Sequence, residues 1–147
     1  MNKFNCVRVQ YKRLHPEAQL PKRANPNDAA SDLYSIETLW IKPGETTNID
    51  TGLVFAVPAG YYVTINGRSS MNKLGLIPFR GIIDAGYNGP LMVTLTNTGA
   101  ISHMIKKGDR IAQITLHECI YYEVEEVEEF SPEYSMRGTR GFGSSGK

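Results

Sequence analysis

The sequence predicts an all-β fold, in the form of a sandwich, barrel or jelly roll, with one short helix and a mobile C-terminal arm. Two observations predict this class. Apolar residues alternate with polar neighbours at the period of a strand instead of a helix, and Gly, Pro and Asn turn signals separate these segments at close spacing. The composition agrees, because 14 glycines, 8 prolines and 8 tyrosines in 147 residues favour many turns and strands.

Each alternating segment is expected to form a strand: residues 7–11, 39–41, 53–57, 61–65, 91–95 and 111–116. The turn at Pro58-Ala59-Gly60 would join two of them. Residues 69–74 start with Ser and are followed by Gly75, which predicts the one short helix. The acidic run 123–129 is expected to be a solvated strand with Val124 and Val127 facing inward.

The length allows one domain of ordinary size, and we expect it to span residues 1–130. From Ser131 the chain becomes rich in glycine, with glycines at positions 138, 141, 143 and 146. Such a segment cannot form a helix or strand by itself. Residues 131–147 are therefore predicted to be a mobile arm that becomes ordered when something binds.

Charge and apolar patterning exclude several classes of protein. The net charge is only +1, from 16 basic against 15 acidic residues, so a basic nucleic-acid binder is not expected. Residues 85–105 are uncharged and long enough to span a membrane, but Gly, Asn and Pro interrupt them throughout. Cys6 and Cys119 do not form a disulfide framework or a zinc motif. We expect a cytoplasmic protein.

The segment Gly67-Arg68-Ser69-Ser70-Met71 places an arginine and two hydroxyl groups where a strand is expected to meet the helix. Helix N-termini attract anions, so Ser69 and Ser70 could donate hydrogen bonds to a phosphate group. A helix cap beside a surface arginine explains the same residues.

The segment 81–89 is an apolar strand that ends in Asp84 and continues into a tight turn carrying Tyr87. A carboxylate at such a strand end could orient a water as a general base. An Asp that opens a turn is also a common structural device, so both interpretations stay open for this segment alone.

Three further features are less specific. Asp32 is a single carboxylate among small residues, and Asp109 and Arg110 are expected to form an ion pair beside a strand that carries Gln113. The histidines at positions 15, 103 and 117 share no ligand-like spacing, which argues against a histidine-based metal site or triad. Arg137 and Arg140 flank glycines whose bare N–H groups could approach an anion, although an unstructured tail explains them too.

Five of these segments occur in the order of a known set of motifs: residues 29–33, 67–71, 81–89, 108–113 and 137–146. In this order they closely resemble the motifs of the trimeric dUTPases, from about Ala29 to the C-terminus. Each motif alone is weak, but all five in order at this chain length are highly specific.

The resemblance implies a jelly-roll-like homotrimer whose three active sites are built from parts of all three chains. It also implies the hydrolysis of dUTP to dUMP and pyrophosphate with Mg²⁺, which lowers dUTP and supplies dUMP for thymidylate synthesis. Cytoplasm is the expected location, or the host-cell cytoplasm or nucleus for a viral protein. No nucleic acid or membrane partner is implied.

Site residues carry over position by position from this resemblance. Asp84 would orient the water that attacks the α-phosphorus, and Tyr87 would pack under the deoxyribose and exclude a 2′-hydroxyl. The remaining residues would contact the base or the phosphates. Uracil would be recognised by the backbone of Gly81, Ile82 and Ile83 together with Met92. The phosphates would be contacted by Arg68, Ser69, Ser70 and Gln113. From the arm, Arg137 would act on the γ-phosphate and Phe142, next to Gly143, would stack on uracil.

Mg²⁺ usually keeps several waters and is held through substrate phosphates, so Asp32 alone could bind a metal-coordinated water.

The chain departs from the family pattern at a few positions. Ala30, Gly67, Pro78, Asn88 and Ser145 stand where the family more often has Gly, Pro, Asn, Arg and Thr. Two alternatives remain open, namely an enzyme related to the dCTP deaminases and a dUTPase-like nucleotide-binding or regulatory protein.

Overall fold

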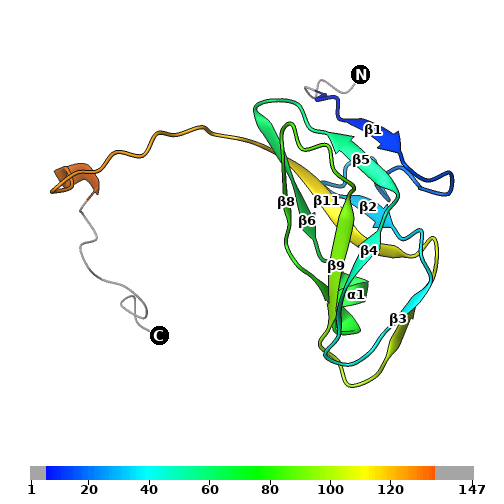
Figure 1. Ribbon diagram of the computed structural model, residues 1–147. Helices are drawn as coiled ribbons and strands as arrows, with labels where there is room; N and C mark the ends of the chain where they lie inside the picture. Colours follow the sequence, from blue (N-terminus) through cyan, green and yellow to red (C-terminus); the bar gives the residue numbers. More distant parts are fainter. Residues whose placement is uncertain (1–5, 135–147) are drawn as a thin grey trace.

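The computed structural model describes residues 6–134 of the chain. Within this range the structure is built from strands, with one α-helix and one 3-10 turn (Figure 1). The elements are β1 (Gln10–Arg13), β2 (Ser31–Tyr34), β3 (Leu39–Ile41), β4 (Thr46–Asp50), β5 (Leu53–Ala56), β6 (Tyr61–Asn66), α1 (Ser69–Lys73), β7 (Leu76–Pro78), β8 (Ile82–Asp84), β9 (Met92–Asn97), β10 (His103–Ile105), β11 (Arg110–Glu118) and the 3-10 turn η1 (Pro132–Tyr134).

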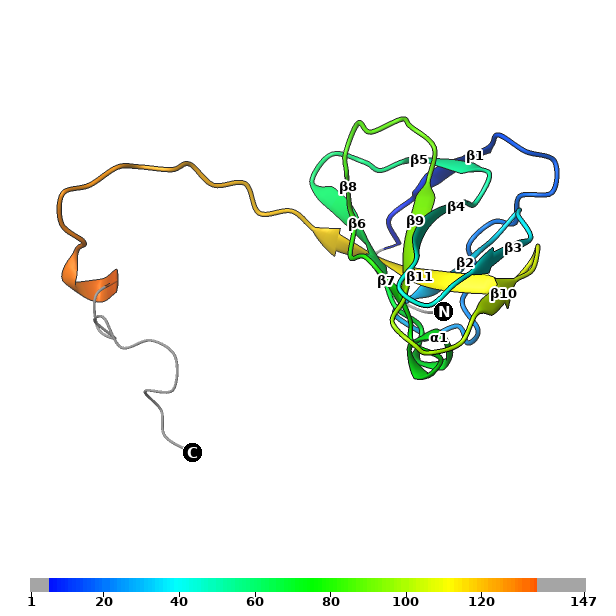
Figure 2. The ribbon, with the colours of Figure 1, turned by 60° about the horizontal axis from the view of Figure 1, so that its bottom comes forward.

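The strands form four antiparallel sheets. The largest has the order β2-β11-β6-β8, and a three-stranded sheet has the order β4-β9-β7. Two smaller sheets pair β1 with β5 and β3 with β10. Figure 2 shows β9 and β4 on one side of the body and β6 and β11 on the other.

Apolar side chains from all four sheets form a single buried cluster. Alternation explains how each strand contributes: in β9, Val93 and Leu95 are buried while Thr94 and Thr96 between and after them are only partly buried. The expected all-β architecture follows from this repeated pattern. In the described residues, no helix is long and apolar enough to cross a membrane.

The structure confirms most of the expected elements and corrects one of them. The strands at 39–41, 53–57, 61–65, 91–95 and 111–116 and the helix at 69–74 are present within a few residues of the expected bounds. The Pro58–Gly60 turn joins β5 and β6 as expected, and the two strands belong to different sheets, since β5 pairs with β1 and β6 pairs with β11 and β8. The turn carries the chain from one sheet to another.

The prediction of a strand at residues 123–129 is wrong. No strand follows β11 in the described residues, and Val124 is 87% exposed instead of facing inward. Figures 1 and 2 show the chain leaving the body after β11 and running away from it to η1. The described body thus ends with β11 at Glu118.

One face of the four-stranded sheet carries polar side chains that hydrogen-bond to one another. Thr64 and Thr115 lie opposite each other, with their hydroxyl oxygens 2.8 Å apart. The Nε2 atom of His117 is 2.7 Å from the Thr115 hydroxyl, and the Asn66 amide donates to both threonines. Residues that face each other in antiparallel strands share a side of the sheet. This register therefore places Gln113 of β11 and Asp84 of β8 on the same face.

Candidate active site

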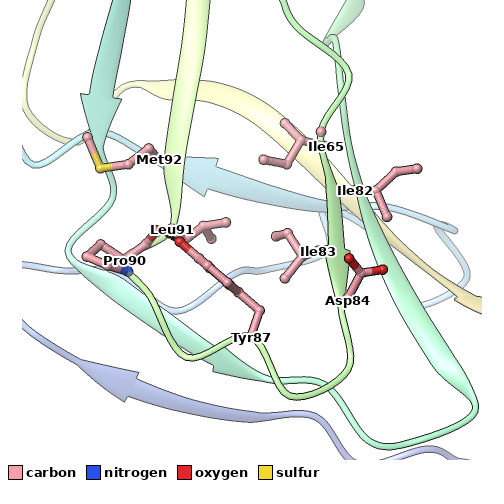
Figure 3. Close-up of a pocket in the computed structure, with 9 residues that line it drawn as sticks. Ile65, Ile82, Ile83, Asp84, Tyr87, Pro90, Leu91 and Met92 are labelled. Atoms are coloured by element: carbon pink, nitrogen blue, oxygen red, sulfur yellow. Dashed lines mark hydrogen bonds between the residues drawn. The ribbon is translucent and has the colours of Figure 1, made fainter.

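A cavity of about 250 Å³ opens between β8, the loop that follows it and the start of β9 (Figure 3). Most of its walls are apolar, and six of its residues belong to the set expected from the sequence. The lining residues are Ile65, Gly81, Ile82, Ile83, Asp84, Tyr87, Pro90, Leu91 and Met92.

Asp84 supplies the carboxylate of this cavity. It is the last residue of β8 and is exposed, and no described side chain or backbone N–H donates a hydrogen bond to its carboxylate. Its backbone carbonyl instead accepts a hydrogen bond from the Tyr87 N–H at 3.3 Å, which closes the turn. Asp84 thus opens a turn through its backbone, and no described residue occupies its carboxylate, so its role as a base stays a prediction.

The rest of the cavity wall carries few polar groups. The side chains of Ile65, Ile83 and Leu91 are buried, and Met92 is 37% exposed at the rim. The carbonyl oxygen of Gly81 accepts a hydrogen bond from the Ile65 N–H at 2.9 Å, which ties this end of the cavity to β6. Such a cavity suits a flat ring with a polar edge.

A second cavity of about 410 Å³ gathers the groups expected to bind phosphate. Asp32, Arg68, Ser69 and Gln113 line it, and Ser70 lies beside it, where its hydroxyl accepts a hydrogen bond from the Arg68 guanidinium at 3.2 Å. The other lining residues are Ala24, Asp28, Ala29, Ala30 and Arg110.

Arg68 is held in place by several partners. Its Nε donates to Asp32 Oδ1 at 2.7 Å, and its side chain is only 17% exposed. One of its terminal nitrogens also donates to the Arg110 carbonyl at 3.2 Å. Gln113 is fixed in a similar way, because its amide donates to the Gly67 carbonyl at 2.8 Å. Guanidinium groups fixed in this manner are well suited to phosphate oxygens.

Arg110 is a site residue that the sequence reasoning missed. It was expected to pair with Asp109, but its guanidinium lies 3.4 Å from Asp32 Oδ2, and Asp109 accepts a hydrogen bond from the Lys106 N–H. A shift in register between Arg110 and Ala112 interrupts the alternation of β11, so position in the sequence did not indicate which way Arg110 points.

The structure brings the expected residues together in two groups, and no residue lines both cavities. Pro78, which departs from the family pattern, is buried in β7 and lines neither cavity, while Asn88 is exposed in the loop after β8. Arg137, Phe142 and Gly143 lie outside the described residues.

Comparison with known families shows one match over most of the chain. The family model described as dUTPase matches residues 16–146, which is most of the chain and includes both cavities. The chain belongs to the dUTPase family. The motif resemblance seen in the sequence is thereby confirmed.

Curated relatives in this family are similar over most of their length. A deoxyuridine 5′-triphosphate nucleotidohydrolase from Nautilia profundicola is 39% identical over 144 residues, covering 96% of this chain and 100% of that protein. One of the same name from Thermobifida fusca is 39% identical over 147 residues, covering 97% of this chain and 81% of that protein.

Solved dUTPase structures share the fold. The Staphylococcus bacteriophage 80alpha dUTPase with dUPNHPP has a TM-score of 0.90 and 31% identity, covering 97% of this chain and 100% of that one. A mutant dUTPase from phage phi11 of S. aureus, described for its coordination of a structural Mg(II) ion, has a TM-score of 0.80 and 26% identity over 84% of this chain and 99% of that one. The all-β, jelly-roll-like class expected for this dUTPase is confirmed.

Proposed function

We propose that the chain is a dUTP diphosphatase that hydrolyses dUTP to dUMP and pyrophosphate, thereby lowering dUTP and supplying dUMP for thymidylate synthesis. The observation that carries the proposal is Asp84, an exposed carboxylate to which no residue within 6–134 donates a hydrogen bond, at the mouth of a mostly apolar cavity in a chain of the dUTPase family. Membership of the family supports the substrate, and the free carboxylate supports the reaction.

In the proposed reaction Asp84 accepts a proton from a water molecule as the water oxygen attacks the α-phosphorus. The new P–O bond yields dUMP, and the bond between the α-phosphorus and the bridging oxygen breaks, so pyrophosphate leaves with that electron pair. Asp84 is available as the base because its carboxylate accepts no hydrogen bond from the described residues.

Selection for uracil and deoxyribose is assigned to the first cavity. The Gly81 N–H and the backbone of Ile82, Ile83 and Met92, which line this cavity, would meet the polar edge of uracil and exclude the methyl group of thymine. Tyr87 stands beside Asp84 in the same cavity, and its ring would lie under the deoxyribose where a 2′-hydroxyl would need space.

Phosphate binding is assigned to the second cavity and the arm. Arg68, Ser69, Ser70 and Gln113 would contact the phosphate oxygens, and the hydrogen bonds that already hold Arg68 and Gln113 support this role. Arg137 would act on the γ-phosphate and Phe142, next to Gly143, would stack on uracil.

We also propose that the active sites are shared between the chains of a closed homotrimer. Asp84 lies two strands away from Gln113 in the sheet and four residues further along. With strand spacings of about 4.8 Å and about 3.4 Å per residue, the two residues are about 17 Å apart. That distance is too long for one phosphate group to contact both, so we assign Asp84 and Gln113 of one chain to different sites.

Mg²⁺ is the proposed cofactor, and it would neutralise charge on the substrate phosphates when bound. No cluster of three or more His, Cys, Asp or Glu that could hold a metal occurs within residues 6–134. The residues fit an ion held mainly by substrate, because Asp32 accepts one hydrogen bond on each oxygen and still has lone pairs for a water molecule.

Pyrophosphate release should be measured with dUTP, dTTP, dCTP and UTP side by side. We expect rapid release of pyrophosphate from dUTP alone. Reaction in ¹⁸O-labelled water should place the label in dUMP. An enzyme related to the dCTP deaminases would instead release ammonia from dCTP. A purely regulatory relative would bind dUTP without hydrolysing it, and either result would reject the proposal.

The C-terminal arm is proposed to close over the bound nucleotide. A chain ended at Ser135 should keep its fold and hydrolyse dUTP far more slowly. Arg137→Ala should reproduce much of the loss, whereas Arg140→Ala, a matched control outside the family positions, should have a smaller effect. Full activity of the truncated chain would remove the arm from the mechanism. A cytoplasmic location stays a prediction.

A further inference from the structure

The loop between β8 and β9 contains two glycines that are required for different physical reasons. Gly86 has a φ of +84°, a backbone conformation that residues with a Cβ atom rarely adopt, and a Cβ there would meet nothing within 4 Å. Gly89 does not have a positive φ. A Cβ on Gly89 would instead collide with the Tyr87 hydroxyl and lie 2.5 Å from Cζ and 2.9 Å from Cε2 of the same ring.

Tyr87 takes the space that a side chain at position 89 would need. Its hydroxyl donates a hydrogen bond to the Pro90 carbonyl at 3.2 Å, so the ring spans the loop and crosses the bare Cα of Gly89. Figure 3 shows the ring running along the loop towards Pro90 and Leu91, with Ile83 and Asp84 across the cavity. The ring is thereby fixed as one wall of the cavity.

We propose that Gly89 is a positioning residue that sets the discrimination between 2′-deoxynucleotides and ribonucleotides through Tyr87. This inference rests on the proposed function, in which the Tyr87 ring fills the space of a 2′-hydroxyl. A side chain at position 89 displaces the ring, breaks its hydrogen bond to Pro90 and opens the wall of the cavity. The enlarged cavity then holds dUTP less well and accepts UTP more readily.

The test is a double-mutant cycle read out as kcat/KM for dUTP and for UTP. It compares the wild type, Gly89→Ala, Tyr87→Ala and the double variant. Gly89→Ala alone should reduce the ratio of dUTP to UTP kcat/KM by about tenfold, mainly through a higher KM for dUTP. In the Tyr87→Ala background the same substitution should change the ratio by less than about twofold, because the ring it displaces is already gone.

Gly86→Ala is the matched control in the same loop. Its Cβ meets no atom of Tyr87, so its effect on the ratio should be the same with and without the tyrosine ring. Circular dichroism and thermal melting report whether each variant folds. If Gly89→Ala fails to fold and the double variant folds, the ring is the obstacle and the proposal stands.

The inference would be overturned if Gly89→Ala changed the ratio of dUTP to UTP kcat/KM by the same factor with and without the Tyr87 ring. It would also be overturned if Gly89→Ala kept the wild-type ratio. Failure of both the single and the double variant to fold would overturn it too, because Gly89 would then serve the backbone alone. A wild-type protein that releases no pyrophosphate from dUTP would refute the proposed function instead, so the two failures are distinct.

Discussion

Asp84 differs from Asp32 and Asp50 in that no described residue donates a hydrogen bond to its carboxylate. Asp32 is bonded to two guanidinium groups, and Asp50 accepts the Gly52 N–H at 2.7 Å, whereas the Asp84 carboxylate faces the cavity alone among the described residues. A carboxylate without donors keeps its lone pairs free for the proton of an attacking water. This contrast at single residues separates a structural acid from the proposed base.

Asp84→Asn should therefore keep dUTP affinity within about tenfold and lower kcat by about 10²- to 10⁴-fold, since the amide cannot accept the proton of the water. Asp50→Asn is the matched control, because the asparagine oxygen can still accept the Gly52 N–H, and its rate should stay near that of the wild type. Single-turnover hydrolysis of dUTP measures both variants. A near-normal rate in Asp84→Asn would remove this residue from the mechanism.

At the scale of elements, a buried amide joins the end of β9 to the chain around β3. Asn97 is fully buried, and its Nδ2 donates to the Ile41 carbonyl at 2.9 Å and to the Ile101 carbonyl at 2.7 Å. Its Oδ1 accepts the Gly99 N–H at 2.9 Å. Every polar atom of this side chain thus has a partner, which stabilises the packing of β9 next to the two-stranded sheet of β3 and β10.

Asn97→Ala should lower the free energy of unfolding by about 1–3 kcal/mol for each buried group left without a partner. Asn48→Ala removes an exposed amide oxygen that accepts from the Thr94 hydroxyl, and it should cost about 0.5–1.5 kcal/mol. Urea unfolding of the two variants compares them directly. Equal losses of unfolding free energy in the two variants would show that burial does not increase the contribution of Asn97 to stability.

Tyr11 gives one element a predicted pH dependence. It lies opposite Phe55 in the β1–β5 pair with the rings edge to face at 4.3 Å, and its burial raises the pKa of its hydroxyl above 10.0. The unfolded chain then loses this proton at lower pH than the folded chain does, so stability falls as pH rises from about 10 through the folded pKa. Urea unfolding between pH 9 and 11 should show this fall in the wild type and a smaller one in Tyr11→Phe.

The strands and the helix could be predicted from the sequence because alternation and turn signals are local. The pairing of β5 and β6 with different sheets could not, since the Pro58–Gly60 signal does not report which strands lie beside them. The strand expected at residues 123–129 failed for a visible reason. Val124 and Val127 are three residues apart and would face opposite sides of a strand, and five glutamates surround them.

The candidate site was predictable to the same degree. The motif order indicated Asp84, Tyr87, Arg68 and Gln113, and the structure places them at two cavities. The ion pairs of Asp32 with Arg68 and Arg110 were not predictable, because these residues meet only when β2, β11 and the start of α1 come together in the fold. Long-range contacts of this kind leave no local pattern in the sequence.

At the scale of the whole molecule, the two cavities of one chain share none of the described residues. We therefore predict that dUTP is hydrolysed where Asp84 of one copy meets Arg68 and Gln113 of another. Sedimentation should give the mass of a closed trimer, whereas a stable and fully active monomer of 16.4 kDa would be incompatible with sharing.

Sharing of the active site between chains is tested most directly with Asp84→Asn and Arg68→Ala, two variants that are each expected to be inactive. The two chains are expressed together with different affinity tags. Tandem purification keeps only trimers that contain both chains. In a closed ring, each such trimer has one site with an intact Asp84 and an intact Arg68 from different chains, so dUTP hydrolysis should recover to about one third of the wild-type rate. A mixed trimer as inactive as either variant alone would place both residues in the site of a single chain and contradict the account.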